Sequence, residues 1–183
     1  EFNISNLVFA ICSIGFDEFS DKYVNDLSFI KLPKGRTELI DNIPNNIIID
    51  YAHNAHSFEV LLSSFKSYFE NLILVFGFGG ERDRSKRAKM LKIALKNSSK
   101  IFLTSDNSRN EAFKDILKDA LNGNNSDDVI IIEDRKEAII NANKFLDKSS
   151  CLLILGKGHE KTQEINGEIY HFSDHEVVDE IYR

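Results

Sequence analysis

The sequence predicts an α/β fold, a Rossmann-like, mostly parallel sheet of about six strands flanked by helices. Four runs of β-branched and aromatic residues, at 47–49, 72–76, 101–103 and 152–155, each stop at a short loop rich in glycine or polar side chains. Strands that are covered on both faces of a parallel sheet are continuously apolar, which explains such runs. In these sheets ligands bind beyond the carboxyl ends of the strands. We therefore expect the four loops to share one edge of the sheet.

The start of the chain differs from the rest. Residues 3–15 fit a helix, and residues 21–26 fit a second, shorter one. Pro33-Lys34-Gly35 marks a turn and a domain boundary. A polar start followed by one apolar helix is too little to fold alone. We therefore expect residues 1–32 to be the incomplete end of an earlier domain, and residues 33–183 to form the main domain of the chain.

Beyond this boundary, strands and helices alternate regularly. Strands are expected at 37–40, 47–50, 72–76, 101–104, 129–132 and 151–155, and helices at 57–69, 86–95, 111–121 and 136–145. The Asn-Gly pair at 166–167 lies between polar–apolar alternations and predicts a hairpin over residues 163–170. Ser173 is expected to cap a last helix that runs through Tyr182.

Composition and charge limit the class of partner. The 183 residues are 42% hydrophobic and 28% charged, as in an ordinary globular protein, and the formal net charge of −6 gives no support for binding nucleic acid. Basic residues cluster only locally, between Arg82 and Lys89, which suits a small anionic ligand. No apolar stretch approaches the ~20 residues of a membrane span, and no signal peptide opens the chain. We expect a cytoplasmic protein in which Cys12 and Cys151 are reduced and buried.

The first of the four loops, Asp50-Tyr51-Ala52-His53, places a carboxylate at the carboxyl end of a strand. Asp50 there can accept hydrogen bonds from sugar hydroxyls, as acidic residues do in nucleotide sites, and the alternative is that it caps the next helix. His53 and His56 lie three residues apart, with no matching carboxylate or cysteine partner. We therefore expect no metal site at this loop.

The second loop, Gly77-Phe78-Gly79-Gly80, is followed by Arg82 and a basic segment. Glycines let the backbone approach a ligand closely, and exposed N–H groups at a helix start favour anions. The guanidinium of Arg82 adds a planar fork suited to a carboxylate or a phosphate. The spacing matches neither a dinucleotide fingerprint nor a Walker phosphate loop. The alternative is a tight turn before a solvated basic helix.

The remaining two loops carry groups of both charges. Asp106-Asn107-Ser108-Arg109 offers an acid, an amide and a guanidinium, and its alternative is a capping turn before the helix at 111. Gly156-Lys157-Gly158-His159-Glu160 is a glycine loop with titratable groups, and it is no zinc-protease motif because the second histidine is missing. Together the loops predict a pocket for a zwitterionic substrate, such as an amino acid, near a nucleotide.

Seven short strings occur in the order in which they occur in the Mur ligases. They are Phe2-Asn3-Ile4-Ser5-Asn6, Gly35-Arg36-Thr37-Glu38, Asp50-Tyr51-Ala52-His53, Phe76-Gly77-Phe78-Gly79-Gly80-Glu81-Arg82-Asp83 with Lys86-Arg87, Asp106-Asn107-Ser108-Arg109, Gly156-Lys157-Gly158-His159-Glu160 and Phe172-Ser173-Asp174. Over nearly its whole length the chain resembles the C-terminal domain of that family, and most of all the tripeptide synthetases (MurE type). It departs from the family pattern at Ser108, where proline is usual, at Glu81, where aspartate is usual, and at Asn54-Ala55.

The resemblance implies an ATP-dependent amide ligase of peptidoglycan precursor synthesis, and so a role in cell-wall biogenesis, cell shape and cell division. In this family ATP phosphorylates a substrate carboxylate, and the incoming amino group attacks the acyl phosphate. The C-terminal domain closes over the central ATPase domain and excludes water. The phosphate loop and the magnesium (Mg2+) ligands belong to that central domain, and no Gly-x-x-x-x-Gly-Lys-Ser/Thr string occurs here. We therefore expect the cofactors ATP and Mg2+ in the parent enzyme and no catalytic activity of this chain alone.

The resemblance also implies roles for individual residues. Those for ATP are Asn3 near adenine, Arg36 at the phosphates, Asp50 at the ribose, and Tyr51 and His53 shaping the pocket. Those for the amino acid are Arg82, Asp106, Asn107, Arg109, Gly156 and Glu160. Guanidinium and amide groups would meet its carboxylate, and Glu160 its ammonium group. The guanidinium of Arg109 favours meso-diaminopimelate, while Ser108 leaves lysine or ornithine open.

The expected partners of the parent enzyme are a diamino acid, UDP-N-acetylmuramoyl-L-alanyl-D-glutamate and the enzyme's own central domain, with no nucleic acid and no membrane. One alternative is another ligase of the superfamily, of the folylpolyglutamate or cyanophycin synthetase type. The strings at 106–109 and 156–160 argue against it. The other alternative is a binding module that senses a nucleotide or an amino acid without turnover.

Overall fold

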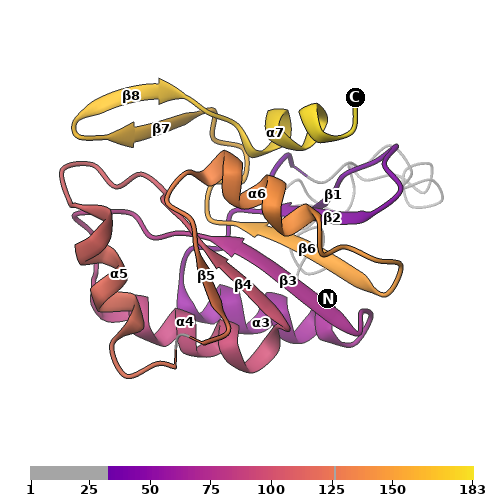
Figure 1. Ribbon diagram of the computed structural model, residues 1–183, viewed down its shortest axis with the longest axis horizontal. Helices are drawn as coiled ribbons and strands as arrows, with labels where there is room; N and C mark the ends of the chain where they lie inside the picture. Colours follow the sequence, from indigo (N-terminus) through magenta and orange to yellow (C-terminus); the bar gives the residue numbers. More distant parts are fainter. Residues whose placement is uncertain (1–32, 126) are drawn as a thin grey trace, which may run out of the picture. The chain divides into compact units, whose positions relative to one another are not determined.

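The main sheet has six strands in the order β1-β2-β6-β3-β4-β5 (Figure 1). The structure is a computed structural model that describes residues 33–125 and 127–183, so the expectations for residues 1–32, including two helices, Asn3 and Cys12, lie outside the described residues. The strands are β1 (Glu38–Leu39), β2 (Asn46–Asp50), β3 (Asn71–Phe76), β4 (Lys100–Leu103), β5 (Val129–Ile131) and β6 (Ser150–Leu155). All neighbours in the sheet are parallel except β1, which is antiparallel to β2.

Helices cover both faces of the sheet (Figure 1). On one side lie α3 (Ala55–Lys66), α4 (Ser85–Asn97) and α5 (Phe113–Leu121), and on the other lie α6 (Arg135–Asn143) and α7 (Asp174–Ile181). The strands β7 (Thr162–Ile165) and β8 (Glu168–His171) form a separate antiparallel hairpin. The predicted fold class and the C-terminal hairpin are confirmed.

The core explains why the strands are apolar at nearly all of their interior positions. One set of strand residues packs with α6 and α7 in a buried cluster, formed by Ile47, Ile49, Ile73, Val75, Phe102, Leu152, Ile154, Ala138, Ile139, Ala142, Val177 and Val178. The alternate strand residues face α3 and α4, where the rings of Phe58 and Phe76 lie 5.0 Å apart, edge to face. Burying each such side chain contributes about 1.5–3 kcal/mol, so both layers stabilise the sheet.

Side-chain capping shifts the start of one helix from its expected position. Helix α3 begins at Ala55 rather than Ser57, because the Asn54 side chain accepts a hydrogen bond from the backbone N–H of Ser57. Asn54, and not Asp50, is therefore the cap of this helix. At α7, Ser173 occupies the cap position as predicted, but its side chain makes no capping hydrogen bond.

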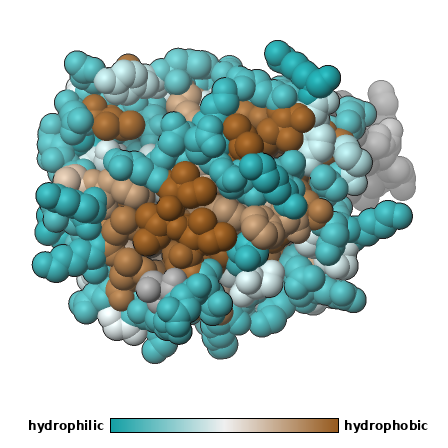
Figure 2. Space-filling view, viewed as in Figure 1, coloured by the Kyte–Doolittle hydropathy of each residue, from teal (hydrophilic) through white to brown (hydrophobic). Residues whose placement is uncertain are grey.

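Some large apolar side chains remain exposed on the surface. Figure 2 shows a largely hydrophilic face with an apolar area near its centre. At the edge of the sheet, Ile131 and Phe145 remain 43% and 48% exposed.

Cys151 is fully buried, and burial raises the pKa of its thiol to about 12. Within the described ranges, no helix has the length and apolarity needed to cross a membrane.

A buried ion pair joins α6, α7 and the end of β6. The guanidinium of Arg135 donates from Nε and Nη2 to the two carboxylate oxygens of Asp174, at 2.8 and 2.9 Å, and neither side chain is exposed. Nη2 also donates to the carbonyl oxygen of Leu155, at 3.0 Å. Arg135 of α6 thus binds the last residue of β6 and is itself held by Asp174 of α7.

A second buried arginine joins α4, the segment before α5 and the glycine loop. Arg87 donates to both carboxylate oxygens of Glu111 at 2.7 Å, to Asp119 at 2.9 Å and to the carbonyl oxygen of Gly79 at 3.2 Å. The hydrogen bond from Arg87 lowers the pKa of Glu111 to about 2, and one from the backbone N–H of Glu81 adds to it. Helix α5 begins at Phe113 rather than at 111, and Glu111 is bound in this network.

The first prediction concerns the buried ion pair. Asp174→Asn should destabilise the fold by about 3–5 kcal/mol, because it leaves the Arg135 charge buried without a counter-charge. The matched control is Glu180→Gln, which makes the same chemical change in the same helix, at a half-exposed pair with Lys136. The control should leave the free energy of unfolding almost unchanged, because an exposed ion pair contributes little. Urea unfolding at neutral pH measures both, and equal losses would contradict the prediction.

The second prediction concerns the acid sensitivity of the Arg87 network. The folded-state pKa of Glu111 lies below its ordinary value of 4.5, so its stabilisation is present above pH 4.5 and is lost as the pH falls toward 2. The free energy of unfolding should therefore differ between the wild type and Glu111→Gln by about 3 kcal/mol at pH 6. This difference should shrink steadily as the pH is lowered to 3. A difference that stays constant over this range would show that Glu111 does not titrate as described.

Candidate ligand-binding site

A cavity of about 580 Å³ lies beyond the carboxyl ends of β2, β3, β4 and β6. Its lining residues are Tyr51, His53, Gly77, Phe78, Gly79, Arg82, Asp83, Lys86, Asp106, Asn107, Arg109, Gly156 and Glu160. All four loops expected to share an edge of the sheet contribute to this lining. The six residues predicted to hold an amino acid are all among them, as are Tyr51 and His53 from the nucleotide set. Their roles as ligands stay predictions.

The amide of Asn107 has a fixed orientation. Its Oδ1 accepts from the ammonium group of Lys157 at 3.2 Å and from the backbone N–H of Glu164 at 3.1 Å. Its Nδ2 donates to Glu160 at 3.0 Å. Because two donors hold the oxygen, the NH₂ group is the end that remains for a ligand, with one of its two hydrogens already used.

The carboxylate of Glu160 is held from the same side. Its Oε2 accepts from Asn107 and, at 3.1 Å, from Lys157. Within the part of the chain that the structure describes, Oε1 accepts no hydrogen bond from protein. Glu160 therefore presents one free, charged acceptor beside the amide donor of Asn107. This pair matches the ammonium and carboxylate groups of an amino acid.

Lys157 is a site residue that sequence reasoning missed. Its side chain is fully buried, and its two polar contacts are with Asn107 and Glu160. The string Gly156-Lys157-Gly158 contains one signal, since the lysine lies two residues after the end of a buried strand and is flanked by glycines. The inward direction of the side chain depends on its contacts with Asn107, 50 residues away, and with Glu160.

The backbone of Arg109 is hydrogen-bonded to the hairpin formed by β7 and β8. Its N–H donates to the carbonyl oxygen of Glu164 at 3.0 Å, and its carbonyl oxygen accepts from Asn166 at 2.6 Å. These bonds hold Arg109 at a φ of 51°, in the left-handed region that costs a side chain about 1–2 kcal/mol. The guanidinium lines the cavity and donates from Nη1 to the carbonyl oxygen of Gly80 at 2.8 Å. The hairpin thus holds the backbone of Arg109 in a position from which its guanidinium lines the cavity.

Two glycines of the second loop serve loop packing. A Cβ on Gly77 would lie 2.4 Å from the carbonyl oxygen of Thr104, and one on Gly80 would lie 1.9 Å from that of Ser108. Both distances are too short for any side chain, so glycine is required where the loops after β3 and β4 touch. Gly77 also lines the cavity, as does Gly79, which lies beside the Arg109 guanidinium. The prediction that the glycines allow close approach therefore applies to protein backbone at Gly77 and Gly80.

The start of α4 supplies the basic side of the cavity through Arg82 and Lys86. The ammonium group of Lys86 donates to the carbonyl oxygen of His53 at 2.9 Å. Burial lowers the pKa of Lys86, with the Asp83 and Asp106 carboxylates opposing this shift and Arg82 adding to it. Asp83 itself accepts from Ser85 and ends the loop at the helix start. Lys86 thus links the loop after β2 to the loop after β3.

The residues predicted for ATP separate into two groups. Tyr51 and His53 line the cavity, with their rings 4.9 Å apart, and the Arg36 guanidinium lies 4.6 Å above the Tyr51 ring. Asp50 is 8% exposed and does not line it. The Asp50 carboxylate accepts from the backbone N–H and the hydroxyl of Thr37, at 2.6 and 3.2 Å, and from the N–H of Ala52 at 2.6 Å. Asp50 therefore fixes the loop that carries Arg36, through its hydrogen bonds with Thr37.

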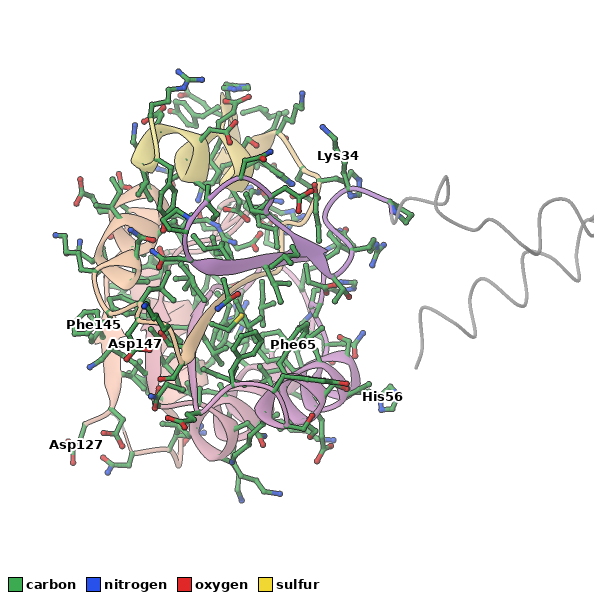
Figure 3. All side chains as sticks on the ribbon, turned by 90° about the vertical axis from the view of Figure 1, so that its right-hand side faces the viewer. Lys34, His56, Phe65, Asp127, Phe145 and Asp147 are labelled. Carbon is green, nitrogen blue, oxygen red and sulfur yellow. The ribbon has the colours of Figure 1, made fainter. Side chains whose placement is uncertain are left out.

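The two histidines of the first loop have separate surroundings. His53 contacts the carbonyl oxygen of Tyr51 through Nδ1, at 2.9 Å. His56 lies on α3 and extends into solvent (Figure 3). Among the residues that the structure describes, no group of three or more His, Cys, Asp or Glu side chains is placed to hold a metal ion.

Comparison with known proteins relates this site to a family. A family model described as Mur ligase, glutamate ligase domain, matches residues 35–158. A UDP-N-acetylmuramoyl-L-alanyl-D-glutamate–2,6-diaminopimelate ligase of Clostridium perfringens (strain 13 / Type A) is 41% identical over 186 residues, which cover 99% of this chain and 38% of that protein. The chain thus spans less than two fifths of this relative's length.

Solved structures agree with this relationship. The structure of a UDP-N-acetylmuramoyl-L-alanyl-D-glutamate–2,6-diaminopimelate ligase matches with a TM-score of 0.78 and 33% identity, over 100% of this chain and 38% of that one. A folylpolyglutamate synthase from Thermotoga maritima matches with a TM-score of 0.55 and 26% identity, over 75% of this chain and 31% of that one. The resemblance carried by the seven strings is confirmed, and the chain belongs to the Mur ligase family.

Proposed function

We propose that this chain is the C-terminal, amino-acid-binding domain of an ATP-dependent amide ligase. The parent enzyme would add diaminopimelate to UDP-N-acetylmuramoyl-L-alanyl-D-glutamate, in the cytoplasmic synthesis of peptidoglycan precursors. The name of a relative that is 41% identical over 99% of the chain supports this substrate pair. In this proposal residues 33–183 are the C-terminal domain and residues 1–32 are the end of the central domain.

The observation that carries the proposal is the paired donor and acceptor set in the cavity. Asn107 and Arg109 offer fixed N–H donors, and Glu160 offers a free carboxylate oxygen beside them. An amino acid carries a carboxylate and an ammonium group on one carbon. The carboxylate would accept from Asn107 and Arg109, and the ammonium group would donate to Glu160. Diaminopimelate has two such ends. If the cavity holds one end, the amino group of the other is free to attack the acyl phosphate carbon, and inorganic phosphate leaves.

The ring of Tyr51 supports a place for the nucleotide at the other end of the cavity. It lies against His53, His159 and the guanidinium of Arg36, an aromatic and cationic surface suited to a base and phosphates. In this proposal Arg36 reaches the phosphates of ATP, and Asp50 acts through the loop that carries Arg36. The Mg2+ ligands would lie in the central domain.

The first rival is a ligase of the folylpolyglutamate synthetase type. The match to such an enzyme covers 75% of the chain at a TM-score of 0.55, whereas the diaminopimelate ligase covers 100% at 0.78. The second rival is a stand-alone sensor. Calorimetric titration of the chain with diaminopimelate and with ADP separates these possibilities, since tight binding without the rest of the ligase would favour a sensor.

The third prediction tests the carboxylate partner. Arg109→Ala in the full-length ligase should raise the apparent KM for diaminopimelate by about 10- to 100-fold, because a charge-assisted bond of roughly 1.5–3 kcal/mol is lost. The apparent KM for ATP should change far less. Lys92→Ala, an exposed cation of α4, is the control and should change neither. Equal rises for both substrates would refute the assigned role.

The fourth prediction concerns substrate choice. When the full-length ligase is offered meso-diaminopimelate, lysine and ornithine together, product analysis by mass spectrometry should find diaminopimelate incorporated in large excess. Lysine and ornithine lack the distal carboxylate, so they would leave the donors of Arg109 and Asn107 unpaired in a half-buried site. Preferential incorporation of lysine would overturn the assignment of the distal carboxylate to this end of the cavity.

A further inference from the structure

The donors of Arg109 are unequally occupied. Nη1 donates to the carbonyl oxygens of Gly80 and Asn107, at 2.8 and 3.3 Å. Nε lies 3.4 Å from a carboxylate oxygen of Glu164. Nη2 has no partner among the described residues. A carboxylate binds a guanidinium best through two N–H groups on one edge. The edge formed by Nε and Nη2 is therefore the one suited to a ligand, and Glu164 already occupies half of it.

Glu164 combines a fixed backbone with a partly exposed side chain. Its backbone is fixed in β7, where the N–H donates to Asn107 and the carbonyl oxygen accepts from Arg109. Its side chain is 37% exposed and lies outside the cavity lining. A partly exposed ion pair is weak, typically below about 1 kcal/mol, so a competing carboxylate can displace it.

We propose that Glu164 determines specificity by acting as an internal competitor for the Arg109 guanidinium. This inference rests on the proposed function, in which Arg109 binds the distal carboxylate of the amino acid. A ligand with that carboxylate must displace Glu164 from Nε before it can bind with two hydrogen bonds. A diamino acid without it leaves the ion pair intact. Glu164 thus lowers the preference for diaminopimelate over lysine.

A different role for Glu164 would be to aim Arg109 at the ligand. The guanidinium is already oriented by the carbonyl oxygens of Gly80 and Asn107, and its backbone is held by the hairpin. The Glu164 carboxylate is therefore not needed for orientation. The two roles predict opposite changes in carboxylate affinity when Glu164 is replaced. Loss of a competitor strengthens carboxylate binding, whereas loss of an orienting partner weakens it.

The fifth prediction uses Glu164→Gln, which keeps the shape of the side chain and its backbone bonds. In the full-length ligase the apparent KM for meso-diaminopimelate should fall about two- to fivefold, the range expected for losing an exposed ion pair. The apparent KM for lysine should not fall, and that for ATP should be unchanged. The matched control is Glu59→Gln, the same change at an exposed position of α3. An unchanged or raised KM for diaminopimelate would overturn the proposal.

A second measurement does not depend on ligase activity. The chain is titrated with 2-aminopimelate, which carries one amino-acid end, while the Arg109 Nε–H resonance is followed by nitrogen-15 NMR. The dissociation constant should be about two- to fivefold lower for Glu164→Gln than for the wild type. If the ligase accepts none of the diamino acids, the proposed function fails, yet this titration still decides the role of Glu164. Equal or weaker binding by the variant would exclude competition.

Discussion

The ion pair between Arg135 and Asp174 is the constraint on which the site depends. It joins the first turns of α6 and α7 and binds the carbonyl oxygen of Leu155, so the loop that begins at Gly156 starts from a fixed point. Burial disfavours the charged form of Arg135, but Asp174, and then Asp106 and Glu160, favour it, so its pKa is raised. Arg135 therefore stays charged, and Asp174 balances that charge within the pair.

The buried lysine and the two buried arginines make the site rigid before any ligand arrives. Lys157 fixes the Asn107 amide and the Glu160 carboxylate that line the cavity, and Arg87 fixes the carbonyl oxygen of Gly79. Preorganised donors and acceptors lose little entropy on binding, which favours a small polar ligand that has few apolar contacts to offer. The same rigidity explains why so many charged side chains can be buried here, since nearly every one of them is hydrogen-bonded.

The sequence was sufficient to predict features that depend on local pattern. Runs such as Ile47–Ile49 predict buried parallel strands, and the rule for strand ends then predicts a shared site. Features that depend on contacts between distant segments were not predictable. The partners Asn107 and Lys157 are 50 residues apart, so no local pattern shows that the lysine is buried. The engagement of Asp50 with Thr37 was missed for the same reason, because an acid at a strand end looks identical whether it binds sugar or backbone.

The close contact between Gly35 and the backbone of His159 links the Arg36 loop to the loop that lines the cavity through Glu160. A Cβ on Gly35 would lie 2.2 Å from the backbone nitrogen of His159, so the Arg36 loop rests directly on the loop that ends in Glu160. The two loops are therefore packed backbone against backbone. A ligand that orders one of these loops would lower the entropic cost of ordering the other loop when a second ligand binds. This effect is reciprocal. Nucleotide and amino acid would then bind with positive cooperativity, whichever of the two arrives first.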